Sequence, residues 1–198
     1  MAQVERLRLN WVSVPPRDWA EEQTYRIAME VKRLRDDKSA QWLSDRTKAL
    51  GAEISRAVIS DLETGRRRYV TTAELIVLAR ALNTVPVSLL YPPPYDSAIQ
   101  ILPNAENDVS ALFAAQWFSG LLSPFETRML VGGEHEELDR NIAPLRNSRE
   151  IFELEERLIE MLRMQPTARD TVVAGALESQ IASVNSRLRE LKRGFDGG

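Results

Sequence analysis

The sequence contains no cysteine and only one histidine, His135, among its 198 residues. Disulfide bonds, thiolate zinc sites and cysteine nucleophiles are therefore excluded, and one chain cannot supply a pair of histidine ligands. No apolar run approaches the roughly 18 residues that a membrane helix needs, and the first residues lack the apolar centre of a signal peptide. We therefore expect a cytoplasmic protein that does not interact with membranes.

Strand patterns and enzyme motifs are also scarce. Only residues 4–14 alternate between apolar and polar side chains as a strand does, and no second strand accompanies them. The chain has no phosphate-binding glycine loop, no Gly-x-Ser-x-Gly and no His-Glu-x-x-His sequence. We predict an all-α protein that is not an enzyme and has no catalytic residues, no cofactor and no metal.

The net charge of −3 hides an uneven distribution. Residues 1–95 carry 15 lysines and arginines against 12 acidic residues, a net charge of +3. Residues 96–198 carry 11 against 17, a net charge of −6. A basic half followed by an acidic half favours two modules with different partners.

Prolines divide the chain into four predicted parts. Pro15 and Pro16 end a short N-terminal arm, and the run of three prolines over residues 91–95 (YPPPY) cannot continue a helix. The predicted parts are an arm over residues 1–17, a helix-turn-helix domain over 18–91, a proline-rich linker over 92–105 and a helical dimerisation or regulatory domain over 106–198.

Five capping sequences predict where helices begin. In each, a short polar side chain can accept a hydrogen bond from a free backbone amide of the first turn, and an acidic residue three positions later can return one. The predicted caps are Asp18, Thr71, Ser123, Asn147 and Thr167. These patterns concern structure and say nothing about function.

Residues 39–68 combine two short helices with a basic run. We predict one helix from its cap Ser39 to about Leu50, with Trp42, Leu43 and Leu50 facing inward. A second helix begins at its cap Ser55 and is stopped by Gly65. Three consecutive arginines, Arg66–Arg68, follow directly. Two short helices joined in this way can place the second one in the major groove of DNA.

This segment resembles a known family. Residues 59–67 (ISDLETGRR) are similar to the I-S-x-L-E-x-G-x-R signature of Xre-type helix-turn-helix regulators, and the chain is similar to an actinobacterial or phage-borne subgroup of them. Residues 73–90 are similar to the family's fourth and fifth helices, with Pro86 opening the fifth. The resemblance covers residues 25–91 and implies a λ repressor-like DNA-binding domain of five helices. The chain departs from it by several extra residues before Ser55, and by Ala40 where many members carry a base-contacting glutamine.

The predicted DNA-binding surface lies at the starts of the two short helices and after the second. Arg56 is the candidate reader of a guanine edge, and Arg66–Arg68 are the candidate phosphate contacts. Asp61 fits a contact with a cytosine amino group or a structural pair with Arg56, and both stay open. The resemblance implies that Glu63 ties the second helix to its surroundings. The predicted DNA-binding residues are Ser39, Gln41, Ser55, Arg56, Ala57, Asp61, Arg66, Arg67 and Arg68.

The last fifty residues carry two apolar seams at alternating three- and four-residue spacing, one over residues 151–161 and one over 174–191. The seams fit either a helical hairpin within one chain or an interface between two chains. We favour a homodimer, because a single helix-turn-helix has a small footprint and usually binds DNA as a symmetric pair. The predicted dimerisation residues are Leu177, Ile181, Val184, Leu188 and Leu191.

These observations predict a nucleoid-associated transcriptional regulator that binds double-stranded operator DNA as a homodimer and represses by occupying a promoter. Two alternatives stay open. One is an antitoxin-like protein that regulates its own operon and binds a basic protein partner through its acidic half. The other is a regulator that senses a small effector within residues 96–140. We interpret the acidic residues around His135 as a solvated turn rather than a metal site; they are Asp108, Glu126 and Glu134–Glu137.

Overall fold

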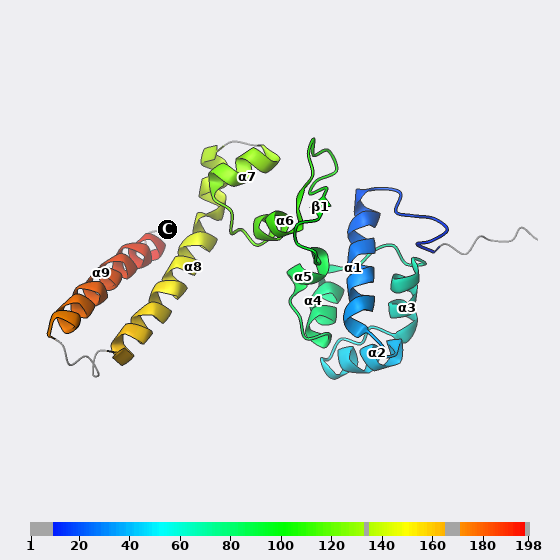
Figure 1. Cartoon of the computed structure of the whole chain (residues 1–198), viewed down its shortest axis with the longest axis horizontal. Helices are drawn as coiled ribbons and strands as arrows, with labels where there is room; N and C mark the ends of the chain where they lie inside the picture. Colours follow the sequence, from blue (N-terminus) through cyan, green and yellow to red (C-terminus); the bar gives the residue numbers. More distant parts are fainter. Residues whose placement is uncertain (1–9, 133–134, 165–170, 197–198) are drawn as a thin grey trace, which may run out of the picture. The chain divides into compact units, whose positions relative to one another are not determined.

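The computed structural model describes residues 10–132, 135–164 and 171–196. In this part of the chain there are nine α-helices, and two strands of two residues each form the only sheet. The all-α prediction is therefore confirmed. The chain divides into two compact units, Met1–Ser119 and Gly120–Gly198 (Figure 1). No described helix combines the length and the apolar character needed to cross a membrane.

Five helices of the first unit surround one apolar core. In chain order they are α1 (Trp19–Arg35), α2 (Ala40–Ala49), α3 (Arg56–Thr64), α4 (Thr72–Ala81) and α5 (Pro86–Leu90). The helices bury their apolar stripes against one another, which removes these side chains from water and provides the main driving force for folding. The most deeply buried large residues of this core are Val31, Leu43, Ile59, Leu78 and Leu89.

Side-chain caps fix the starts of α1–α4, as the sequence predicts. Asp18, Ser39, Ser55 and Thr71 each accept a hydrogen bond from a backbone amide of the turn that follows. Gly65 ends α3 with a left-handed φ of 85°, a conformation that glycine adopts without strain. The inward orientation predicted for Leu50 is wrong. This residue follows the last turn of α2 as its C-cap, and its side chain is exposed.

The described end of the N-terminal arm is a turn and not a strand. The side-chain oxygen of Asn10 accepts hydrogen bonds from the amides of Val12 and Ser13, which folds the chain back on itself. Residues 4–9 of the predicted strand lie outside the described residues.

The boundary between the units follows Ser119 and does not lie in the linker predicted over residues 92–105. The segment over residues 92–105 contains β1 (Ala98–Ile99), which pairs antiparallel with β2 (Val109–Ser110), and α6 (Ala111–Phe118) follows directly. These elements belong to the first unit. Ile99 and Ile101 are buried, and the indole N–H of Trp19 in α1 donates to the carbonyl of Gln100 at 3.1 Å. The first unit consequently ends only at Ser119.

The second unit contains α7 (Pro124–Val131), α8 (His135–Met164) and α9 (Thr171–Asp196). Ser123 caps α7 in the predicted manner. The start predicted at Asn147 is wrong, because α8 begins twelve residues earlier and continues through Pro144. The helix α7 packs against α8. The predicted cap Thr167 lies outside the described residues.

The apolar seam of α9 faces α8 within the same chain. Val184 and Leu188 are buried with Met161, and partly buried residues from both helices flank them. Two ion pairs, Arg187 with Glu150 and Lys192 with Glu155, each at 2.6 Å, cross between the helices. The hairpin alternative therefore holds, and this surface is not available for the dimer predicted earlier. The residues enclosed in this way are Leu177, Ile181, Val184, Leu188 and Leu191.

Candidate nucleic-acid interface

A buried threonine hydroxyl fixes the connection between α2 and α3. The hydroxyl of Thr47 accepts from the amide of Ile54 at 2.9 Å and lies 2.8 Å from the carbonyl oxygen of Ser44, to which it donates. Gly51 makes the turn with φ 84°. The extra residues before Ser55 thus form a defined loop, and α3 is held by its buried residues Ile59 and Leu62.

The start of α3 is open to solvent. The hydroxyl of Ser55 caps the helix by accepting from the amide of Val58 at 3.3 Å, and Arg56 and Ala57 are exposed. None of the ion pairs within residues 10–132 includes Arg56. Its guanidinium is therefore available to donate two parallel hydrogen bonds to an external acceptor pair.

The predicted DNA-binding residues at the start of α2 are exposed, but their side chains already form hydrogen bonds within the helix. The hydroxyl of Ser39 accepts from the amide of Trp42 at 3.0 Å, and the side-chain amide of Gln41 donates to Asp45 at 2.8 Å. The guanidinium of Arg46 lies over the Trp42 ring, 5.0 Å from its centroid. This end of α2 presents a polar surface whose hydrogen bonds are largely satisfied within the helix.

The three consecutive arginines separate into one exposed and two enclosed side chains. Arg66 is 47% exposed, and its Nε donates to Asp61 at 2.5 Å, so Asp61 pairs with this arginine and not with Arg56. Arg67 is 16% exposed, donates to both carboxylate oxygens of Glu74 at 2.6 and 2.9 Å and lies over the ring of Tyr69. The predicted phosphate contact by Arg67 is therefore corrected, because both terminal nitrogens of its guanidinium bind Glu74 and its Nε is buried without a partner.

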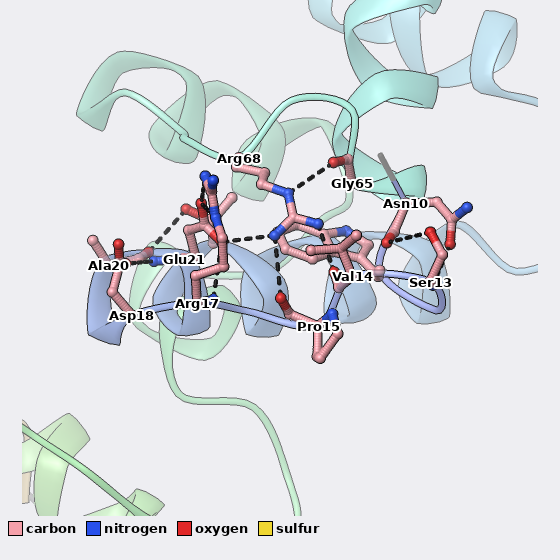
Figure 2. Close-up of polar contacts among 12 residues, drawn as sticks. Asn10, Ser13, Val14, Pro15, Arg17, Asp18, Ala20, Glu21, Gly65 and Arg68 are labelled. Atoms are coloured by element: carbon pink, nitrogen blue, oxygen red, sulfur yellow. Dashed lines mark hydrogen bonds and ion pairs between the residues drawn. The ribbon is translucent and has the colours of Figure 1, made fainter. Parts of the chain in front are cut away.

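Arg68 is the most enclosed of the three, with only 8% of its side chain exposed. Figure 2 shows its guanidinium between the N-terminal segment and Glu21, with which it pairs at 2.6 Å. It also donates to the carbonyl oxygens of Val14, Pro15 and Gly65 at 2.6, 3.3 and 3.1 Å. The predicted phosphate contact by Arg68 is thus also corrected, since its nitrogen atoms are already satisfied.

Trp11 completes this cluster from the side of α3. Its indole N–H donates to the carbonyl of Leu62 at 2.9 Å, and its backbone amide donates to Thr64 at 3.0 Å. Its ring lies under the Arg68 guanidinium and so close to Gly65 that an added Cβ there would approach it to 2.7 Å. Residues 10–17, which we call the N-terminal strap, thereby hold the C-terminal end of α3.

The strap is not predictable from local sequence patterns. Residues 1–17 have the sequence of an arm without evident contacts, and no local pattern links Trp11 to a site more than fifty residues away. The one available signal was Gly65, whose lack of a side chain serves both the left-handed turn and the contact with the tryptophan. On the opposite side of α3, Arg35 donates to Glu63 at 2.8 and 2.7 Å and ties this helix to α1.

Hydrogen bonds from two arginines set the charge state of Glu21. Those from Arg17 and, to a lesser extent, from Arg68 lower the pKa of this carboxyl to about 2, although its burial acts in the opposite direction. Glu21 therefore stays ionised in the folded protein at all but very acidic pH. A permanent negative charge at this point holds Arg68, and through it the strap.

Within the described residues, no three histidine, cysteine or acidic side chains come close enough together to hold a metal ion. In the predicted acidic group, Glu126 serves as the capping partner of Ser123 at the start of α7. Glu134 lies outside the described residues.

The chain matches no family model, no curated protein and no solved structure. The candidate interface therefore rests on its own geometry. That geometry is an exposed helix start at Ser55–Ala57, with the exposed Arg66 after the same helix.

Replacing Arg68 with alanine should lower the free energy of unfolding of the first unit by about 3 kcal/mol or more, because the change breaks a buried ion pair and removes the strap's anchor. Arg66→Ala is the matched control, and this exposed neighbour should change stability by no more than about 0.5 kcal/mol. All four tryptophans lie within residues 1–119, so urea denaturation followed by tryptophan fluorescence reports on this unit. Equal losses in the two variants would contradict the enclosed position of Arg68.

Acid should weaken the first unit partly through Glu21. Its folded pKa of about 2 lies below its unfolded value, so its stabilisation is complete above about pH 4.5 and is lost as the pH falls towards 2. Glu21→Gln should therefore be less stable than the wild type at pH 7, and the difference should narrow over this range. Urea denaturation at several pH values measures this difference in stability. A difference that stays constant over the range would refute the lowered pKa of Glu21.

Proposed function

We propose that the chain is a sequence-specific DNA-binding transcriptional regulator that binds operator DNA as a dimer. In this proposal α1–α5 form a λ repressor-like domain, α2 and α3 are its helix-turn-helix, and α3 enters the major groove. Repression requires only that the bound protein occupy a promoter, which makes a repressor the simplest form of such a regulator.

The exposed start of α3 is the observation that carries the proposal. Arg56 lies in the first turn of a nine-residue helix whose opposite face is buried by Ile59 and Leu62. A helix of this size fits the major groove of B-form DNA, and an arginine at its leading end can contact O6 and N7 of guanine together. The small neighbours Ser55 and Ala57 leave room for a close approach to the base edges.

The charge of the surrounding segment supports the same proposal. Residues 24–69 carry eleven lysines and arginines against seven acidic residues, a net charge of +4. Arg66 lies just beyond α3 with nearly half of its side chain exposed. Its pairing with Asp61 leaves further donors on the guanidinium for a phosphate oxygen, because the ion pair uses only Nε.

Replacing Arg56 with alanine should relax base preference at one position of each half-site, at a cost of about 1–3 kcal/mol for that base pair. Nonspecific affinity and thermal stability should change little, because the side chain is exposed and outside the core. An operator selected from random DNA, followed by competition with all its single-base variants, measures the effect. Arg80→Ala, an exposed arginine on α4, is the control. An even loss of preference across the site would contradict the role of Arg56.

Replacing Arg66 with alanine should weaken binding to all DNA sequences alike. The slope of log affinity against log salt concentration should fall by about 0.9, the value for one lost phosphate contact. Arg67→Ala, the control, should leave this slope unchanged because its guanidinium is bound to Glu74. Filter binding or fluorescence anisotropy over a salt series provides the slopes. Equal slopes for wild type and Arg66→Ala would refute the phosphate contact.

A further inference from the structure

The second unit carries an apolar stripe that its own hairpin does not cover. Leu145, Phe152 and Ile159 of α8 follow one another at intervals of seven residues, and their exposed fractions are 48%, 61% and 49%. Leu162 continues the stripe with 48% exposed. A seven-residue interval keeps side chains on one side of a helix, so these residues form a continuous surface along α8.

This stripe is separate from the seam that faces α9. Ile151, Leu154 and Leu158 pack against α9. At 100° per residue their mean direction lies roughly 125° around the helix from that of the three stripe residues spaced by seven. The helix α8 is thus apolar on two faces. The helix α9 covers one, whereas the residues of the other remain 48–61% exposed, although Leu145 lies beside Gly120. Contiguous exposed apolar residues of this kind mark interaction sites.

The spacing of the stripe is symmetric about Phe152. If two copies of α8 lie antiparallel with a two-fold axis at this residue, Phe152 meets its own counterpart. Leu145 of each copy then faces Ile159 of the other, because both lie seven residues from the axis. A two-fold interface requires this kind of self-complementarity, in which residue i contacts j and j contacts i.

Within residues 140–164 of α8, the segments before and after Phe152 carry opposite net charges. The twelve residues before Phe152, residues 140–151, contain three arginines and one glutamate, a net charge of +2. The twelve residues after it, 153–164, contain four glutamates and two arginines, a net charge of −2. An antiparallel pair brings these segments together with opposite charges, whereas a parallel pair places like charges side by side.

We infer that the exposed stripe of α8 is the site at which two copies of this chain associate, antiparallel and with Phe152 on the two-fold axis. This interface would supply the dimer that the proposed DNA binding requires, and its biological role rests on that proposed function. It replaces the α9 seam, which the hairpin encloses, with an exposed face of the neighbouring helix α8.

The absence of cysteine makes this arrangement directly testable in the full-length protein. On mild oxidation Phe152→Cys should form a disulfide-linked dimer, whereas Glu153→Cys, one residue away on α8, should stay largely monomeric. Leu145→Cys should not link to itself but should link to Ile159→Cys when the two variants are mixed. Self-linking of Leu145→Cys, or equal linking of Phe152→Cys and Glu153→Cys, would overturn the antiparallel pairing.

Light scattering without DNA provides the second measurement. The wild type should have twice the chain mass of 22.5 kDa. Phe152→Asp should have the monomer mass with unchanged helical circular dichroism. Ile76→Asp, which changes an exposed apolar residue of the first unit, is the control and should remain a dimer. A monomeric wild type, or a dimeric Phe152→Asp, would overturn the inference. A dimer that binds no DNA would instead overturn only the proposed function.

Discussion

The architecture around α3 depends on the buried pairing of Arg68 with Glu21. This contact joins the segment after α3 to the first turn of α1, and the same guanidinium holds the carbonyl oxygens of Val14 and Pro15. Burying a charged group is costly unless its hydrogen bonds are met, and here the carboxylate, three carbonyl oxygens and the Trp11 ring meet them. The direction in which α3 presents its exposed start follows from this anchor and from the Arg35–Glu63 pair on its other side.

Local patterns in the sequence predicted the helices of the first unit well. Caps such as Asp18 and Thr71 act within four residues, and the stop at Gly65 needs only one residue in a left-handed conformation, so neighbouring residues suffice to identify them. The roles within the arginine run depend on distant partners instead. Nothing between Arg66 and Arg68 indicates that the first is exposed while the last lies between Trp11 and Glu21.

In the second unit, the spacing of apolar residues likewise does not identify the partner of a helix. The three- and four-residue spacing of Leu177 to Leu191 requires a helical partner, but the spacing is the same whether that partner is α8 or another chain. The short connection between α8 and α9 decides in favour of the hairpin, because the two helices are tethered at high effective concentration. The helix start predicted at Asn147 is wrong for a related reason, since a capping sequence inside a longer helix looks the same as one at a helix start.

The strap has a consequence for the order in which the first unit can assemble. Trp11 reaches its partner Leu62 across 51 residues of sequence, so the contact must close a long loop and cannot precede the formation of α3. During synthesis the strap leaves the ribosome well before Gly65 and Arg68, to which it binds. The strap is thus synthesised early but is among the last parts of the unit to settle, and a domain that began at residue 18 would lack the buried Trp11.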